Sequence, residues 1–186
     1  MQYSRSFLAG FSPDRRIEWT MFLLGSAPDL AKDSLLIVGP RYEPELLLAR
    51  GLGWDQAGIR GLDTFSYSPF IDVGDMHDMP YPDATFSGLV CGWTLSYSSR
   101  PQAAVREMQR VVKPGGYLVV AVQKVPPDFV ETLSEVPRGP DRVQTLERFD
   151  ALYDRCARVA GFEREVGSGG EAHTIALYRK DFPDAT

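Results

Sequence analysis

Short apolar runs alternate along the chain with amphipathic segments. The apolar runs are bounded by turn residues and predict strands at residues 34–38, 58–62, 87–93, 117–122, 162–166 and 173–179. Apolar positions at helical spacing predict helices over residues 12–25, 44–50, 101–112 and 146–160. This alternation predicts an α/β fold: a doubly wound, mainly parallel Rossmann-like sheet with helices on both faces and an antiparallel strand at one edge.

The pattern is most regular in the strand–helix–strand unit at residues 87–122. Pro101 suits the first turn of the helix, and Pro114 with the pair Gly115 and Gly116 ends it. Both strands are continuously apolar, which is typical of parallel strands that are covered on both faces.

One connection is too short for this architecture. Only residues 64–69 separate Asp63 from the apolar stretch at 70–73, whereas a parallel crossover needs about a dozen residues and usually a helix. We therefore expect the covering helix to be missing here and the strand that follows to be short, irregular or absent. Phe65 and Tyr67 are predicted to take over part of the missing packing.

The composition is that of a globular protein. Of 186 residues, 44% are hydrophobic and 24% charged, which predicts a single domain over residues 1–186. Within it we expect an N-terminal helical segment at 1–33 and a possible lid loop at 126–145, where prolines break the pattern.

Charge and hydropathy narrow the class of partner. The net charge is −5 and Lys and Arg do not cluster, which argues against nucleic acid. No apolar run approaches the length of about 18 residues that a membrane span needs. The N-terminus does not resemble a secretory signal, and Cys91 and Cys156 lack metal-ligand spacing. We expect two reduced thiols in a cytoplasmic protein.

A family resemblance covers roughly half of the chain. The stretch GDMHDMPYPDATFSGLVCGW at residues 74–93, followed by EMQRVVKPGGYLVVAV at 107–122, resembles the second half of class I S-adenosylmethionine (SAM)-dependent methyltransferases. The resemblance implies SAM as the cofactor and methyl transfer to an acceptor, which we expect to be a small molecule. Such a transfer can proceed largely by alignment and exclusion of water, so a general base is optional.

The resemblance also implies a cofactor site. Asp63 would accept hydrogen bonds from the ribose hydroxyls, Asp75 would accept from the adenine amino group, and the Met76 backbone would meet the ring edge. Trp93 could wall the cofactor or the substrate, or it could pack under the helix that begins near Pro101. The predicted cofactor site comprises Gly39, Arg41, Glu43, Asp63, Thr64, Phe65, Asp75, Met76, Gly92 and Trp93.

The turn after the first strand departs from the family pattern. Only Gly39 remains of a turn that is usually glycine-rich, and Arg41 and Glu43 stand where further glycines are usual. Arg41 could pair with the cofactor carboxylate, because a guanidinium matches its two oxygens, while Glu43 meets the polar end groups. Alternatively, Arg41 forms an exposed ion pair with Glu43 or Glu45 and the turn binds nothing.

Catalytic residues are not evident. His77 and Tyr97 are weak candidates, and His77 could equally be a surface or capping residue. Asp75, His77 and Asp78 are adjacent on one loop and seldom converge on an ion in that arrangement, so we expect no metal. An alternative function is a methyltransferase-like domain that has lost SAM-dependent catalysis, and that acts as a binding or partner protein or on a nucleotide-linked ligand. A dinucleotide-dependent oxidoreductase is disfavoured because G-x-G-x-x-G is missing after the first strand.

Overall fold

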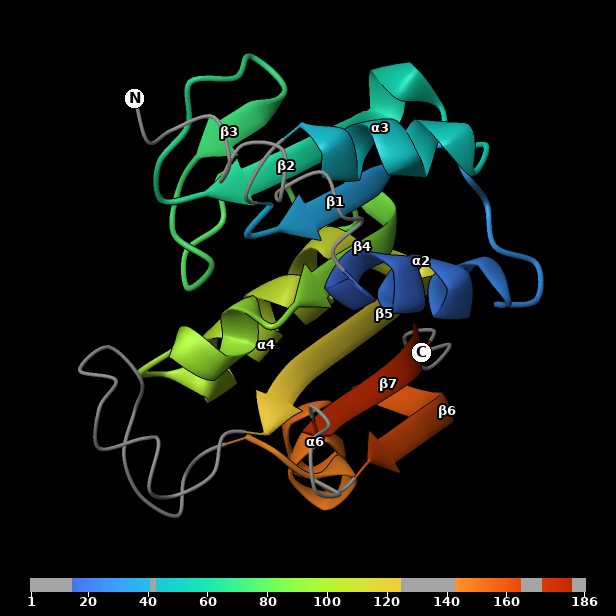
Figure 1. Cartoon of the computed structure of the whole chain (residues 1–186), viewed down its shortest axis with the longest axis vertical. Coiled ribbons are helices and arrows are strands. Elements are labelled where there is room, and N and C mark those ends of the chain that lie inside the picture. The colour runs from blue at the N-terminus through green and yellow to red at the C-terminus, as the bar shows by residue number, and fades with distance from the viewer. Residues whose placement is uncertain (1–14, 41–42, 125–142, 165–171, 182–186) are drawn as a thin grey trace, which may run out of the picture.

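The computed structural model describes residues 15–40, 43–124, 143–164 and 172–181. Its centre is a 7-stranded sheet in the order β3-β2-β1-β4-β5-β7-β6 (Figure 1). β1 to β5 run parallel, and β7 lies antiparallel between β5 and β6. The strands are β1 (Leu35–Val38), β2 (Ile59–Asp63), β3 (Ile71–Val73), β4 (Phe86–Gly92), β5 (Val112–Lys124), β6 (Cys156–Arg164) and β7 (Ala172–Lys180). The predicted mainly parallel Rossmann-like sheet with an antiparallel strand is confirmed.

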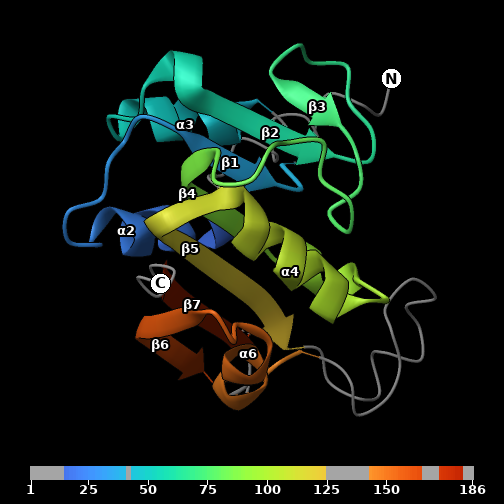
Figure 2. The same cartoon turned by 180° about the vertical axis from the view of Figure 1, so that it is seen from behind.

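Helices cover both faces of the sheet. The helix α2 (Arg15–Gly25) and the helix α3 (Pro44–Gly51) lie on one face, and α4 (Pro101–Val111) and α6 (Leu146–Leu152) lie on the other (Figures 1 and 2). Short 3-10 turns follow α3 and β4: η1 (Gln56–Gly58) and η2 (Thr94–Tyr97). No helix in the described ranges is both long and apolar enough to cross a membrane.

Strand β1 shows why the chain folds into these layers. All four of its residues are buried, and successive side chains of a strand point to opposite faces. Leu35 and Ile37 join the apolar core beneath α2 and α3, whereas Leu36 and Val38 join the core beneath α4 and α6. A continuously apolar strand is therefore required at this position.

The predicted absence of a helix between β2 and β3 is confirmed. The chain passes from Asp63 to a three-residue strand, β3, through turns and bends alone. Ser66 and Ser68 satisfy backbone groups within this loop, since Ser68 N–H donates to Ser66 Oγ at 2.9 Å and Phe70 N–H to Ser68 Oγ at 3.2 Å. Leu47 of α3 stays exposed nearby, so this end of the sheet is less covered than the rest.

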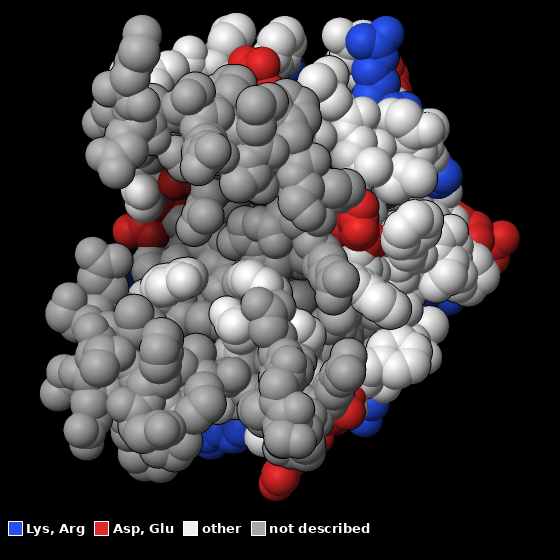
Figure 3. Space-filling view, in the orientation of Figure 1, with Lys and Arg blue, Asp and Glu red and all other residues white. Residues whose placement is uncertain are grey.

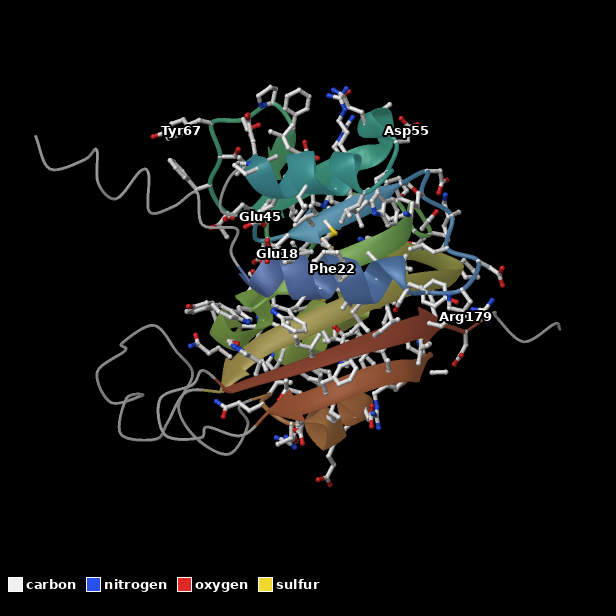
Figure 4. All side chains as sticks on the ribbon, turned by 45° about the vertical axis from the view of Figure 1, so that its right-hand side comes forward. Glu18, Phe22, Glu45, Asp55, Tyr67 and Arg179 are labelled. Atoms are coloured by element: carbon white, nitrogen blue, oxygen red, sulfur yellow. The ribbon has the colours of Figure 1, made fainter. Side chains whose placement is uncertain are left out.

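The packing predicted for Phe65 and Tyr67 is wrong. Their exposed fractions are 64% and 92%, and they contact each other edge-on with ring centroids 4.7 Å apart. Figure 4 shows Tyr67 pointing away from the sheet. Because the loop is closed by its own serines, nothing draws the two rings onto the core.

The helix predicted over residues 146–160 is also wrong in its second half. α6 ends at Leu152, and Cys156 already belongs to strand β6, which pairs with β7. The buried Gln109 side chain of α4 holds the turn between them, since its Oε1 accepts from Arg155 N–H at 3.0 Å. The predicted strand at 117–122 is longer than expected, because β5 begins at Val112 directly after α4.

Candidate functional site

The carboxyl ends of four adjacent strands form one edge of the sheet. Strand order reverses at β1, which lies between β2 and β4, and open α/β sheets bind ligands outside the carboxyl ends at such a switch point. In the register, Val38 of β1 is level with Leu62 of β2 and with Cys91 of β4. The structure therefore brings to this edge the strand-end residues predicted from the sequence, which are Gly39, Asp63, Asp75, Met76, Gly92 and Trp93 (Figure 1).

Gly39 is held in a conformation and a space that favour glycine. Its φ is +70°, and a Cβ built on it would lie 2.0 Å from Thr94 Oγ1. The Thr94 hydroxyl lies 3.2 Å from the Val38 carbonyl oxygen, and Gly39 N–H donates to the Leu62 carbonyl at 2.8 Å. The turn after β1 is thus packed against the start of η2. Sequence reasoning missed Thr94, because nothing local marks it as the neighbour of Gly39.

Asp63 ends β2 with a carboxylate that is only partly used. Its carbonyl oxygen accepts from Gly74 N–H at 2.9 Å, which fixes the backbone beside the loop after β3. The carboxylate accepts from the hydroxyl of the exposed Thr64 at 3.3 Å. Since a carboxylate has about four acceptor positions, Asp63 retains capacity for neighbouring hydroxyl donors.

Asp75 lies in the loop after β3 and interacts with His77. The Asp75 Oδ1 atom accepts from His77 N–H at 2.8 Å and lies 2.5 Å from His77 Nδ1. The backbone hydrogen bond from His77 is the main cause that lowers the pKa of Asp75, with the imidazole adding to it. Met76 packs its side chain against the core beneath α4.

Helix α4 anchors this acidic loop. Glu107 Oε2 accepts from Met79 N–H at 2.8 Å, and the Arg110 guanidinium donates to the Met79 carbonyl at 3.0 Å and to the Tyr81 carbonyl at 2.7 Å. Glu107 and Arg110 also pair with each other at 2.7 Å, and this hydrogen bond lowers the pKa of Glu107. Their i, i+3 spacing on α4 was a usable signal that sequence reasoning did not exploit.

Trp93 is an aromatic residue in the left-handed region, with φ 62°, where non-glycine residues are uncommon. Its N–H donates to the Ala121 carbonyl of β5 at 2.7 Å. Its ring stacks on His173 of β7, with centroids 5.3 Å apart and planes 13° apart. β7 is antiparallel to β5, so its first residues reach the carboxyl edge. Tyr97, at the end of η2, is exposed.

Some predicted site residues do not join this cluster. Phe65 contacts Tyr67. Glu43 lines a surface groove along α3 and β2 with Leu46, Leu47, Arg50, Gln56, Ile59 and Phe70. Arg41 and most of the predicted lid loop lie outside the described residues. Across the described ranges, no group of three or more His, Cys, Asp and Glu side chains is arranged to hold a metal ion. Figure 3 shows the molecule in the orientation of Figure 1, and acidic and basic side chains are scattered over the described part of its surface in that view.

Comparison with known proteins connects this edge to a known family. Residues 52–120 match a family described as "Methyltransferase domain". The chain is 32% identical over 100 residues to a ubiquinone/menaquinone biosynthesis C-methyltransferase of Coxiella burnetii, covering 53% of this chain and 40% of that protein. It is 32% identical over 69 residues to a demethylmenaquinone methyltransferase of Symbiobacterium thermophilum, covering 36% of this chain and 28% of that protein. The chain thus spans less than half the length of these relatives.

A solved structure shares the fold over nearly the whole chain. The 1,6-didemethyltoxoflavin-N1-methyltransferase of Burkholderia thailandensis, with bound 1,6-didemethyltoxoflavin and S-adenosylhomocysteine, aligns with a TM-score of 0.68 and 10% identity. The alignment covers 96% of this chain and 84% of that one. At this identity the likeness concerns the fold alone.

Proposed function

We propose that the chain is a class I SAM-dependent methyltransferase that transfers a methyl group from SAM to a small-molecule acceptor, an interpretation supported by the match of residues 52–120 to a methyltransferase domain and by the named relatives. The observation that carries this proposal is the pair of carboxylates, Asp63 and Asp75, at neighbouring strand ends. Both keep acceptor capacity toward a ligand. The names of the relatives, which are quinone-pathway methyltransferases, support a small-molecule acceptor.

The residues at this edge fit the nucleoside half of SAM. Asp63 is partly exposed and is hydrogen-bonded through its side chain to one neighbouring hydroxyl, so it suits the two ribose hydroxyl donors. Asp75 uses Oδ1 for His77 and is 55% exposed at its side chain, so it suits the adenine amino group. The loop that carries Asp75 is anchored to α4, and an acceptor fixed before binding costs less to order.

The methionine half of SAM would lie toward the turn after β1. This half carries a carboxylate, and Arg41 has the matching charge. We propose that Arg41 pairs with the carboxylate, because its planar fork of donors matches two oxygens. Gly39 lets the backbone of this turn pass tightly beside Thr94.

The acceptor would approach from the side of η2 and β7. The stacked rings of Trp93 and His173 lie there, and the exposed Tyr97 offers a hydroxyl. When bound, SAM would supply an electrophilic methyl group on its sulfonium, with S-adenosylhomocysteine as the neutral leaving group. The contribution of the chain is then to align the acceptor and exclude water.

Two free thiols, Cys91 buried and Cys156 partly buried, support a cytoplasmic location.

Calorimetric titration with SAM, S-adenosylhomocysteine and NAD tests the proposal. Both adenosyl ligands should bind, and Asp63→Ala should weaken them by about 1–3 kcal/mol, because ribose hydroxyls lose their acceptor. Asp55→Ala is the matched control, since Asp55 lies before the other end of β2 and caps η1 (Figure 4). If the wild-type protein binds neither adenosyl ligand, the proposed function is refuted. Binding of NAD alone would favour a nucleotide-dependent activity of another kind.

A further inference from the structure

The imidazole of His77 joins two loops at the ligand edge. Its Nδ1 lies 2.5 Å from Asp75 Oδ1, and its Nε2 lies 2.7 Å from Ser98 Oγ. Asp75 belongs to the loop after β3, whereas Ser98 follows η2 and precedes α4. The ring is 11% exposed and Ser98 is 4% exposed. His77 therefore forms a largely buried bridge whose outer end is the exposed carboxylate of Asp75.

The hydrogen bonds assign the protons of this bridge. The Asp75 carboxylate can only accept, so the proton between it and the ring is carried by His77 Nδ1. In the neutral imidazole Nε2 then accepts from the Ser98 hydroxyl, whose oxygen also accepts from Arg100 N–H at 3.1 Å. With both ring nitrogens engaged, His77 has no position left to take a proton from a methyl acceptor. The buried Ser98 hydroxyl is likewise engaged on both sides.

The same contacts orient the Asp75 carboxylate. The His77 backbone N–H and the ring Nδ1 both bond to Oδ1. Within the part of the chain that the structure describes, Oδ2 makes no hydrogen bond to protein. One oxygen is held by the protein and the other is presented at the edge of the sheet. A carboxylate pinned in this way loses little rotational freedom when a ligand donates to it.

We propose that His77 is a positioning residue: fixed by Ser98, it holds Asp75 so that Oδ2 meets the 6-amino group of the cofactor's adenine. The inference rests on the proposed function. According to this proposal, the bridge of Asp75, His77 and Ser98 distinguishes adenine from a base that carries a hydrogen-bond acceptor at its 6-position. A carbonyl oxygen there would face the carboxylate with no proton between them.

The test compares two ligands that differ at the edge of the base that carries position 6. S-adenosylhomocysteine has the 6-amino group and an unprotonated N1, whereas S-inosylhomocysteine has a 6-carbonyl and a proton on N1. In His77→Phe, which keeps a ring without its nitrogens, affinity for S-adenosylhomocysteine should fall about tenfold while affinity for S-inosylhomocysteine stays nearly constant. His77→Asn keeps a donor for Asp75 but cannot reach Ser98, and it should recover part of the preference. Ser98→Ala should lose about threefold, again for the adenosyl ligand.

Controls separate positioning from folding. Asp78→Asn makes the same change of charge on the same loop as Asp75→Asn, and Asp78 is exposed. Asp75→Asn should abolish the preference and Asp78→Asn should keep it. Equal losses for both ligands in the His77 variants, or no loss for either, would overturn the proposal. If His77→Phe does not fold, His77→Asn and Ser98→Ala give the same decision. Wild-type protein that binds neither ligand would instead refute the methyltransferase function.

Discussion

The contact between Gly39 and Thr94 predicts a large penalty for adding one methyl group. In Gly39→Ala the new Cβ would lie 2.0 Å from Thr94 Oγ1, 2.6 Å from its Cγ2 and 2.8 Å from its Cβ. None of these atoms belongs to the flexible end of a long side chain. Thr94 cannot move away freely, because its hydroxyl lies within hydrogen-bond distance of the Val38 and Gly92 carbonyl oxygens, at 3.2 and 3.3 Å.

Two costs add up in this variant. Placing alanine at φ +70° costs about 1–2 kcal/mol, because the Cβ approaches the following carbonyl oxygen. Overpacking against Thr94 costs a further ~1–3 kcal/mol. The free energy of unfolding of Gly39→Ala should therefore fall by about 2–5 kcal/mol, which is a large share of the stability of an ordinary domain.

A double-mutant cycle with Thr94→Ala separates the two costs. Thr94→Ala alone should lose about 1 kcal/mol with its hydroxyl. In the double variant the two closest atoms are gone, so Gly39→Ala should cost about 1–2 kcal/mol less than it does in the wild type. Gly51→Ala is the matched control, because nothing lies within 4 Å of its added Cβ. Its stability should not fall and should rise by no more than about 1 kcal/mol, because alanine is compatible with this helical position and loses less backbone entropy on folding.

Urea denaturation followed by circular dichroism measures all four variants. The reasoning fails if Gly39→Ala loses less than about 1 kcal/mol, which is the strain cost alone. It also fails if the two substitutions are strictly additive, since the close contact then carries no energy.

Two further outcomes can be measured with the same protein. Arg110→Ala should weaken S-adenosylhomocysteine binding several-fold and lower the free energy of unfolding by about 1–3 kcal/mol, because the Met79 and Tyr81 carbonyls lose their donor. Arg106 is exposed on the same helix, so Arg106→Ala should change neither quantity. Equal effects of the two substitutions would contradict the anchoring role of Arg110. The Lys113 ammonium lies 2.6 Å from Asp33 Oδ2 and, together with the Ser87 hydroxyl, lowers the pKa of Asp33 from 3.8 to about 2. The ionised Asp33 therefore stabilises the fold above pH 3.8, and this contribution is lost as the pH falls toward 2. Asp33→Asn should cost under ~1 kcal/mol at neutral pH, because the pair is exposed, and its difference from wild type in urea midpoint should vanish in acid; a difference that grows in acid would refute this linkage.

Features that depend on interactions between residues close in the sequence could be predicted, whereas features that depend on distant residues could not. Strand β1 was predictable because continuous apolarity reflects burial on both faces, and the missing helix before β3 followed from chain length alone. The end of α6 was not predictable from its own spacing. Leu152 and Tyr153 continue a helical period that reaches Cys156 and Val159, but pairing with β7 decides the structure of residues 156–164.

The candidate site divides in the same way. Asp63 was predicted because it follows a strand, and Asp75 because its loop resembles the acidic loop of the family; the structure places both at the same edge of the sheet. The partners that set their chemistry were not predicted, since Ser98 is 21 residues from His77, and the stack of Trp93 on His173 joins β4 to the C-terminal hairpin. Such pairs depend on side-chain placement after folding, which local patterns do not encode.

The position of β7 has a consequence for the order in which the chain can fold during synthesis. β5 pairs with β7 on the side away from β4, and Val119 and Val120 of β5 are fully buried. Until residues 172–180 leave the ribosome, β5 has one bare flank, and the nascent chain presents an apolar strand edge of the kind that seeks other strands. Trp93 also lacks its ring partner until that moment. Completion of the sheet and stacking of His173 on Trp93 therefore occur together, once residues 172–180 have been synthesised.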